Sequence, residues 1–127
     1  MPPDHPPACR VGEILPNAHL AIVSPRKLRD YALNPDPDAD HDGRHKARVF
    51  AAVLDIHQRD WQYLRDWLLL GVRHWPVVRI RPGRRDGWRY EVVIPVIGRN
   101  GMQAPVTTGW VVEGGLPRLA TAYIRNP

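Results

Sequence analysis

The segment WRYEVVIPVIGRNG, residues 88–101, decides the fold of this chain. Within it, apolar side chains stand at every second position, and these are Trp88, Tyr90, Val92, Ile94 and Val96. The charged residues Arg89 and Glu91 stand between them, so an extended strand would have one apolar and one polar face. Asn100-Gly101 follows, and this pair accepts the positive φ angles of a tight hairpin. The segment therefore predicts a long strand, buried on one face, that leads into an antiparallel hairpin.

The sequence on either side predicts three more strands. Residues 78–81 alternate between apolar and arginine side chains, and a turn rich in glycine and arginine at residues 82–87 separates them from the long strand. A third strand covers residues 102–112, and after a second glycine-rich turn a last strand covers residues 119–124. Consecutive strands joined by short turns predict an antiparallel meander.

The first half of the chain has helical periodicity instead. Ser24 followed by Pro25 marks the start of a short helix that stops at Asn34-Pro35. Two further helices are predicted at residues 44–56 and 60–73, where apolar residues recur at helical spacing. The expected fold class is therefore α+β, with two to three N-terminal helices packed on a four-stranded antiparallel meander sheet.

The chain is long enough for one domain. Its 127 residues suffice for a single core, and no internal repeat divides them. Residues 1–10 are rich in proline and predict a disordered leader, so residues 11–127 are expected to form a single α+β domain.

Composition narrows the classes of partner. The formal net charge is +5, which favours an anionic partner. A single cysteine, Cys9, excludes a disulfide framework, and the six histidines lack the spacing of metal ligands, so no metal or cofactor is expected. No apolar run approaches the length that spans a bilayer, and the N-terminus lacks a signal-peptide core. We therefore expect a cytoplasmic site of action and no membrane partner, although a module delivered by a larger carrier would have the same composition.

The stretch GRHKARVF, residues 43–50, carries the most informative polar residues. Cationic or titratable side chains crowd the start of the second predicted helix, and these are Arg44, His45, Lys46 and Arg48. The free N–H groups and dipole of a helix start favour anions, so cations there are unfavourable unless a bound phosphate offsets them. The alternative is a solvated basic helix face anchored by Phe50.

Polar residues of the last two strands form a second candidate group. Thr108 and Trp110 share a face of the third strand, and Thr121 and Tyr123 share a face of the fourth. Hydroxyls donate to phosphate oxygens and aromatic rings stack on bases, so these four side chains together would suit single-stranded RNA. Alternatively, they are ordinary strand residues that pack on a helix.

The first predicted strand adds positive charge. Arg79 and Arg81 stand on the face opposite Val78 and Ile80. Such arginines can hold a nucleic-acid backbone by charge, and they can equally form a solubilising surface.

Several separated motifs also occur in one order along the chain. They are LPNA at 15–18, KLRDYALNP at 27–35, GRHKARVF at 43–50, GRNG at 98–101, TTGW at 107–110 and PRLATAY at 117–123. Over residues 15–124 the chain thereby resembles an uncharacterised bacterial domain family, a domain of unknown function. Such domains resemble, in layout, the C-terminal modules of polymorphic toxins and phage head-morphogenesis fusions. Small basic modules of that kind, with helices before a sheet, are often metal-independent ribonucleases of the barnase, colicin and RelE-like superfold.

The resemblance implies an RNA-cleaving toxin-type domain, and the chemistry assigns roles to its residues. Cleavage without metal needs a proton carrier, donors for the phosphate and charge that stabilises the transition state. Lys46 is the first candidate for that charge and His45 the natural proton carrier. The hydroxyls expected to hold the phosphate are those of Thr108, Thr121 and Tyr123. The residues expected to bind the nucleic acid are Arg44, Arg48, Arg79, Arg81 and, as a stacking platform, Trp110.

The expected partners follow from this hypothesis. They are RNA and a cognate acidic inhibitor protein that would cover a basic cleft. A toxin-type domain would reach the cytoplasm as part of a larger secreted or phage protein. The alternative is a non-catalytic nucleic-acid- or protein-binding module, such as an inhibitor, an antitoxin or a phage assembly domain.

Overall fold

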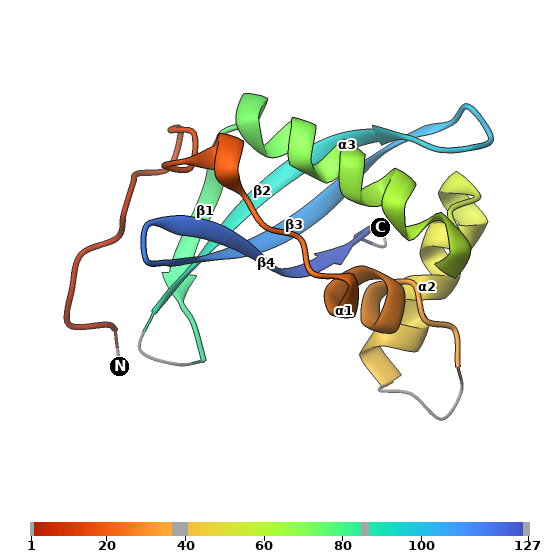
Figure 1. Ribbon diagram of the computed structural model, residues 1–127, viewed down its shortest axis with the longest axis horizontal. Helices are drawn as coiled ribbons and strands as arrows, with labels where there is room; N and C mark the ends of the chain where they lie inside the picture. The colour runs from red at the N-terminus through yellow and green to blue at the C-terminus, as the bar shows by residue number, and fades with distance from the viewer. Residues whose placement is uncertain (1, 37–40, 85–86, 126–127) are drawn as a thin grey trace.

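Helical elements come first and four strands follow (Figure 1). The computed structural model describes residues 2–36, 41–84 and 87–125, with the backbone alone for residues 41–44. The helical elements are η1 (Ala18–Leu20), α1 (Pro25–Lys27), η2 (Leu28–Ala32), α2 (His41–Leu54), η3 (Gln58–Asp60) and α3 (Trp61–His74). The strands are β1 (Val77–Pro82), β2 (Trp88–Ile97), β3 (Gln103–Glu113) and β4 (Leu116–Tyr123). They form one antiparallel sheet in the order β1-β2-β3-β4, which confirms the predicted α+β meander.

The helix starts follow the local sequence. The side chain of Ser24 accepts a hydrogen bond from the backbone N–H of Arg26 at 3.2 Å, and Pro25 occupies the first helical position, as predicted. The short helix differs from the prediction after Lys27, where α1 gives way to the π-helical turn η2. The second helix, α2, begins at His41, three residues before the predicted start. These differences leave the predicted number and order of helices unchanged.

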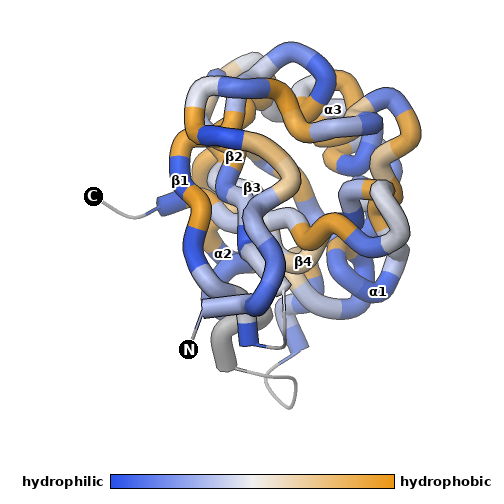
Figure 2. Tube along the Cα trace, turned by 90° about the vertical axis from the view of Figure 1, so that its left-hand side faces the viewer, coloured by the Kyte–Doolittle hydropathy of each residue, from blue (hydrophilic) through white to orange (hydrophobic). Residues whose placement is uncertain are grey.

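The third helix, α3, lies across one face of the sheet (Figure 1). Hydrophobic and hydrophilic stretches alternate along it, as expected for a helix buried on one side (Figure 2). Its buried residues are Leu64, Leu68, Gly71 and Val72. Gly71 permits the close approach to β2, because a Cβ atom at this position would lie only 2.2 Å from Cγ2 of Ile94. Any larger residue at this contact would therefore force the side chain of Ile94 or the helix itself to shift.

The substitution Gly71→Ala should destabilise the fold by about 1–3 kcal/mol, because the added methyl overpacks the contact with Ile94. The gain in helix propensity from glycine to alanine, about 1 kcal/mol, offsets part of the cost. Urea unfolding monitored by tryptophan fluorescence measures the change. In an Ile94→Ala background the same substitution should cost less, since the clashing methyl is gone. Equal costs in both backgrounds would contradict the packing explanation.

The two faces of the sheet differ in character. The face under α3 carries the apolar residues of β2 and their cross-strand partners, because directly paired residues share a face. The opposite face carries Arg89, Glu91, Gly109 and Thr121. We call this opposite side the polar face.

The N-terminal segment, predicted to be a disordered leader, contacts the sheet. The indole Nε1 of Trp88 donates to the backbone oxygen of His5 at 2.9 Å, and the N–H of Ala8 donates to the Tyr90 hydroxyl at 2.7 Å. Farther along, the N–H of Gly12 donates to the carbonyl of Val77 at 2.8 Å. Residues 5–12 thus run beside β1 and β2, and the sequence did not indicate this because its prolines suit both an extended contact and disorder.

Candidate functional site

The structure brings Lys46 of α2 to Thr121 of β4. The ammonium Nζ donates to Oγ1 of Thr121 at 3.0 Å, and the contact is partly buried. Because an ammonium has only donors, the threonine oxygen is the acceptor and its own proton can still be donated. The pair therefore presents a positive charge and a hydroxyl donor side by side, which is what an anion requires.

Two tyrosine rings flank the same ammonium. Nζ of Lys46 lies 5.1 Å from the ring centroid of Tyr31 and 5.5 Å from that of Tyr123. The faces of aromatic rings attract cations, so these rings help to hold the ammonium in a half-buried position. Tyr123 was a predicted site residue, whereas the sequence pattern placed Tyr31 only in the apolar stripe of the first helix.

A glycine at the centre of the polar face adds Arg89 to this group. Gly109 pairs with Glu91 on one side and Thr121 on the other. A Cβ atom at Gly109 would lie 2.8 Å from Cγ2 of Thr121 and 3.4 Å from Nη1 of Arg89. The side chains of Arg89 and Thr121 therefore approach one point above Gly109. We call Lys46, Thr121 and Arg89 the cationic cluster.

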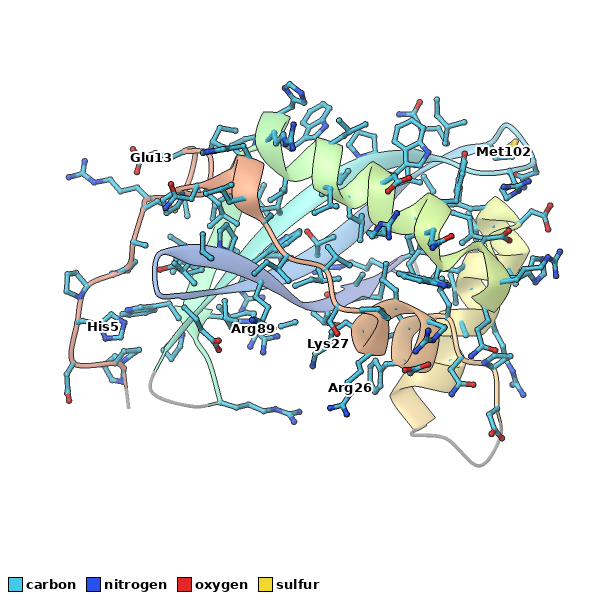
Figure 3. All side chains as sticks on the ribbon, in the orientation of Figure 1. His5, Glu13, Arg26, Lys27, Arg89 and Met102 are labelled. Atoms are coloured by element: carbon cyan, nitrogen blue, oxygen red, sulfur yellow. The ribbon has the colours of Figure 1, made fainter. Side chains whose placement is uncertain are left out.

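The guanidinium of Arg89 is in an unfavourable electrostatic environment. In the part of the chain that the structure describes, its Nε is buried and has no hydrogen-bond acceptor. Burial lowers the pKa of Arg89, and the neighbouring charges of Arg81 and Arg84 lower that pKa further. Figure 3 shows the side chain on the side of the sheet away from α3. A partly desolvated cation among like charges is favoured only when an anion is near.

A carboxylate lies next to the cluster. Glu91, the cross-strand neighbour of Gly109, has a side chain that is 13% exposed and accepts from Nη2 of Arg125 at 3.4 Å. A hydrogen bond with Tyr123 raises the pKa of Arg125, and the nearby charge of Glu91 raises that pKa further. The polar face thus holds a proton acceptor, a phenol and several cations within a few residues of Gly109.

Thr108 and Trp110 lie on the other face, in the core. Both side chains are completely buried, Nε1 of Trp110 donates to Oγ1 of Thr108 at 2.7 Å, and that hydroxyl donates to the carbonyl of Val92 at 2.6 Å. The sequence predicts that they lie beside Thr121 and Tyr123, but the register pairs Thr121 with Gly109 instead. A shift of one residue reverses the face of every side chain, so the two groups are separated by the sheet.

The other predicted residues that the structure describes lie on α2 and β1. His45 and Arg48 are exposed on α2, and successive helical positions point about 100° apart, so neither follows the direction of Lys46. The side chain of Arg44 lies outside the described residues. Arg79 and Arg81 are exposed on β1 and pair with Glu91 and Arg89, which places them on the polar face.

Arg89, Gly109 and Tyr31 were not among the residues predicted for the site. The signal for Arg89 was present, because it occupies the polar side of the strand that decides the fold. Two features of the structure single out Arg89. It pairs with the like charge of Arg81 across the β1–β2 turn, and its side chain passes over Gly109, which has no side chain to block it. Both features depend on which residues pair between neighbouring strands, and the sequence pattern does not give this pairing.

The described residues contain no group of three histidine, cysteine, aspartate or glutamate side chains that could hold a metal ion. Every helix in the described part of the chain is too short or too polar to cross a membrane.

The fold of this chain is similar to that of a known structure. A chain of a contact-dependent growth inhibition toxin–immunity protein complex from Klebsiella pneumoniae 342 is similar in structure, with a TM-score of 0.66 and 14% sequence identity. The match covers 87% of this chain and 97% of that chain, so nearly the entire fold is shared. No curated protein matches the sequence.

A family model matches residues 14–126, a span that contains every helix and strand of the structure as well as the cationic cluster. The family is described as a domain of unknown function, DUF6883. The chain belongs to this family.

Proposed function

We propose that this protein is a metal-independent RNA-cleaving domain of the toxin type. The observation that carries the proposal is the hydrogen bond from Lys46 to Thr121, formed near Arg89, whose buried Nε has no hydrogen-bond acceptor among the described residues. These groups offer a hydroxyl donor and two positive charges at one half-buried place on the polar face. Stabilising charge where it develops on phosphorus is the largest requirement of RNA cleavage without metal.

The chemistry divides among the residues of the polar face. The 2′-oxygen of a ribose forms a bond to phosphorus while the bond from phosphorus to the 5′-oxygen breaks. Glu91 accepts the proton of the 2′-hydroxyl, and Tyr123 donates a proton to the leaving 5′-oxygen. Lys46 and the hydroxyl of Thr121 stabilise the negative charge on the equatorial phosphate oxygens. The products are a 2′,3′-cyclic phosphate and a 5′-hydroxyl end.

The toxin assignment draws support from the structural neighbour, which comes from a toxin–immunity protein complex. A toxin of this kind would act in the cytoplasm after delivery within a larger protein, and it would need a cognate inhibitor. The net charge of +5 favours an acidic inhibitor that covers the polar face.

The purified protein should cleave single-stranded RNA in the presence of EDTA, because the proposed mechanism uses no metal ion. Gel analysis of the fragments and detection of cyclic phosphate ends measure the reaction, and induced expression should arrest growth. Salt-dependent RNA binding without cleavage or growth arrest would favour the alternative, a non-catalytic nucleic-acid-binding module. Cleavage that EDTA abolishes would contradict the metal-independent chemistry.

A further inference from the structure

The first observation is the position of Arg89 relative to Thr121. Both side chains approach the space that a Cβ atom of Gly109 would fill, with Nη1 of Arg89 at 3.4 Å and Cγ2 of Thr121 at 2.8 Å from that point. Nζ of Lys46 lies 3.0 Å from Oγ1 of the same threonine, so the lysine and the arginine both approach Thr121. Two cations and a hydroxyl therefore come together on the polar face.

The second observation is that Arg89 lacks an acceptor where it needs one. Its Nε is buried, and none of the described residues accepts a hydrogen bond from it. Arg81, its direct cross-strand partner, and Arg84 at the turn increase the repulsion instead of relieving it. A guanidinium presents its N–H donors in a fixed fork that matches the oxygens of a phosphate.

We propose that Arg89, Thr121 and Lys46 form a binding site for one phosphate group of a single-stranded nucleic acid. The guanidinium of Arg89 and the ammonium of Lys46 both bind the phosphate, and the Thr121 hydroxyl donates to it. Arg81 and Arg84 attract the neighbouring phosphates of the same strand. This inference deepens the proposed function, because it names the group that the site recognises, and it concerns binding instead of cleavage.

Phosphate fits this site better than the carboxylate of a protein partner. The charges of Arg81 and Arg84 act on Arg89, and Lys46 contacts Thr121 on the same face of the sheet. A polynucleotide supplies a negative charge at every residue. A single carboxylate would neutralise only one of these charges. Several cations near one another therefore match a strand with repeated negative charges better than a single carboxylate.

The test uses a short fluorescent single-stranded DNA oligonucleotide, which lacks the 2′-hydroxyl and cannot be cleaved by the proposed chemistry. Fluorescence anisotropy over a series of salt concentrations gives the affinity and its salt dependence. Arg89→Met keeps the apolar stem over Gly109 and removes the charge. It should weaken binding by about tenfold, as expected for the loss of a hydrogen bond between charged groups, and should lower the slope of log affinity against log salt by about 0.7.

The matched control is Arg73→Met. Arg73 is exposed on the last turn of α3, the helix that covers the other face of the sheet. This variant has the same net charge as Arg89→Met and should bind as the unaltered protein does. If the two variants weaken binding equally, Arg89 acts only through net charge and the proposed site is wrong.

Two further readouts separate this inference from a structural role and from the proposed function. Arg89→Met should raise the thermal unfolding temperature of the free protein, because it removes a partly buried, repelled charge. Inorganic phosphate should compete with the oligonucleotide on the unaltered protein and less so on Arg89→Met.

A lower unfolding temperature together with weaker binding would assign Arg89 to the fold and overturn the site. If binding depends on Arg89 but RNA is never cleaved, the site stands and the ribonuclease proposal fails.

Discussion

Lys46→Ala should lower the rate of RNA cleavage by about 10²–10³-fold, the usual effect of removing one preorganised donor to a developing negative charge. The substitution removes the ammonium that bonds Thr121 at 3.0 Å and leaves the hydroxyl, the tyrosine rings and the sheet in place. The fold should tolerate it, because one net hydrogen bond contributes only about 0.5–1.5 kcal/mol. Initial rates on single-stranded RNA at fixed salt in EDTA measure the effect, and cells should survive induction of the variant.

The chain contains one other lysine, which provides the control. Lys27 is exposed at the end of α1 (Figure 3), and Lys27→Ala changes the net charge by the same amount. This variant should cleave RNA at close to the unaltered rate. Full activity of Lys46→Ala would remove the proposed site from the reaction. Loss of RNA binding by Lys46→Ala alone, in a protein that never cleaves RNA, would instead support a binding module.

Most of the fold could be predicted from the sequence because its determinants are local. The alternation of apolar and polar residues in residues 88–96 predicts a strand that is buried on one face, and the Asn100-Gly101 pair predicts a turn. Ser24 with Pro25 marks a helix start in the same way. Each signal lies within a few residues, so it needs no knowledge of distant contacts. The π-helical turn η2 has no such signal.

The candidate site could be predicted only in part, because it depends on pairing between distant segments. Lys46, Thr121 and Tyr123 were singled out by residue type, and the structure places them together. The residues of β3 that lie beside Thr121 and Tyr123 are decided by the register between β3 and β4, and a bulge follows Gly109 in this pairing. An alternation of polar and apolar residues cannot identify the partner of Thr121, so a pattern could not choose between Thr108 and Gly109.

Trp110→Ala should destabilise the fold by about 3–5 kcal/mol, because it removes a large and completely buried side chain and leaves a cavity. A loss of this size is a large part of the 5–15 kcal/mol that typically stabilises a domain, so we expect the unfolding temperature to fall by about 10–20 °C. Urea unfolding followed by circular dichroism measures the change. Trp110→Phe should cost less, since the ring still fills most of the space and chiefly the hydrogen bond to Thr108 is lost.

This prediction also separates the two roles that an aromatic strand residue can have. A stacking platform contributes to binding and little to stability, whereas a core residue does the reverse. Well below its unfolding temperature, Trp110→Phe should therefore bind the DNA oligonucleotide as tightly as the unaltered protein. Weaker binding by the folded variant, with unchanged stability, would mean that Trp110 reaches the nucleic acid. The indole of Trp110 is completely buried in the core and donates a hydrogen bond to Thr108. We therefore expect substitutions of Trp110 to lower the stability of the fold and to leave the affinity for the oligonucleotide unchanged.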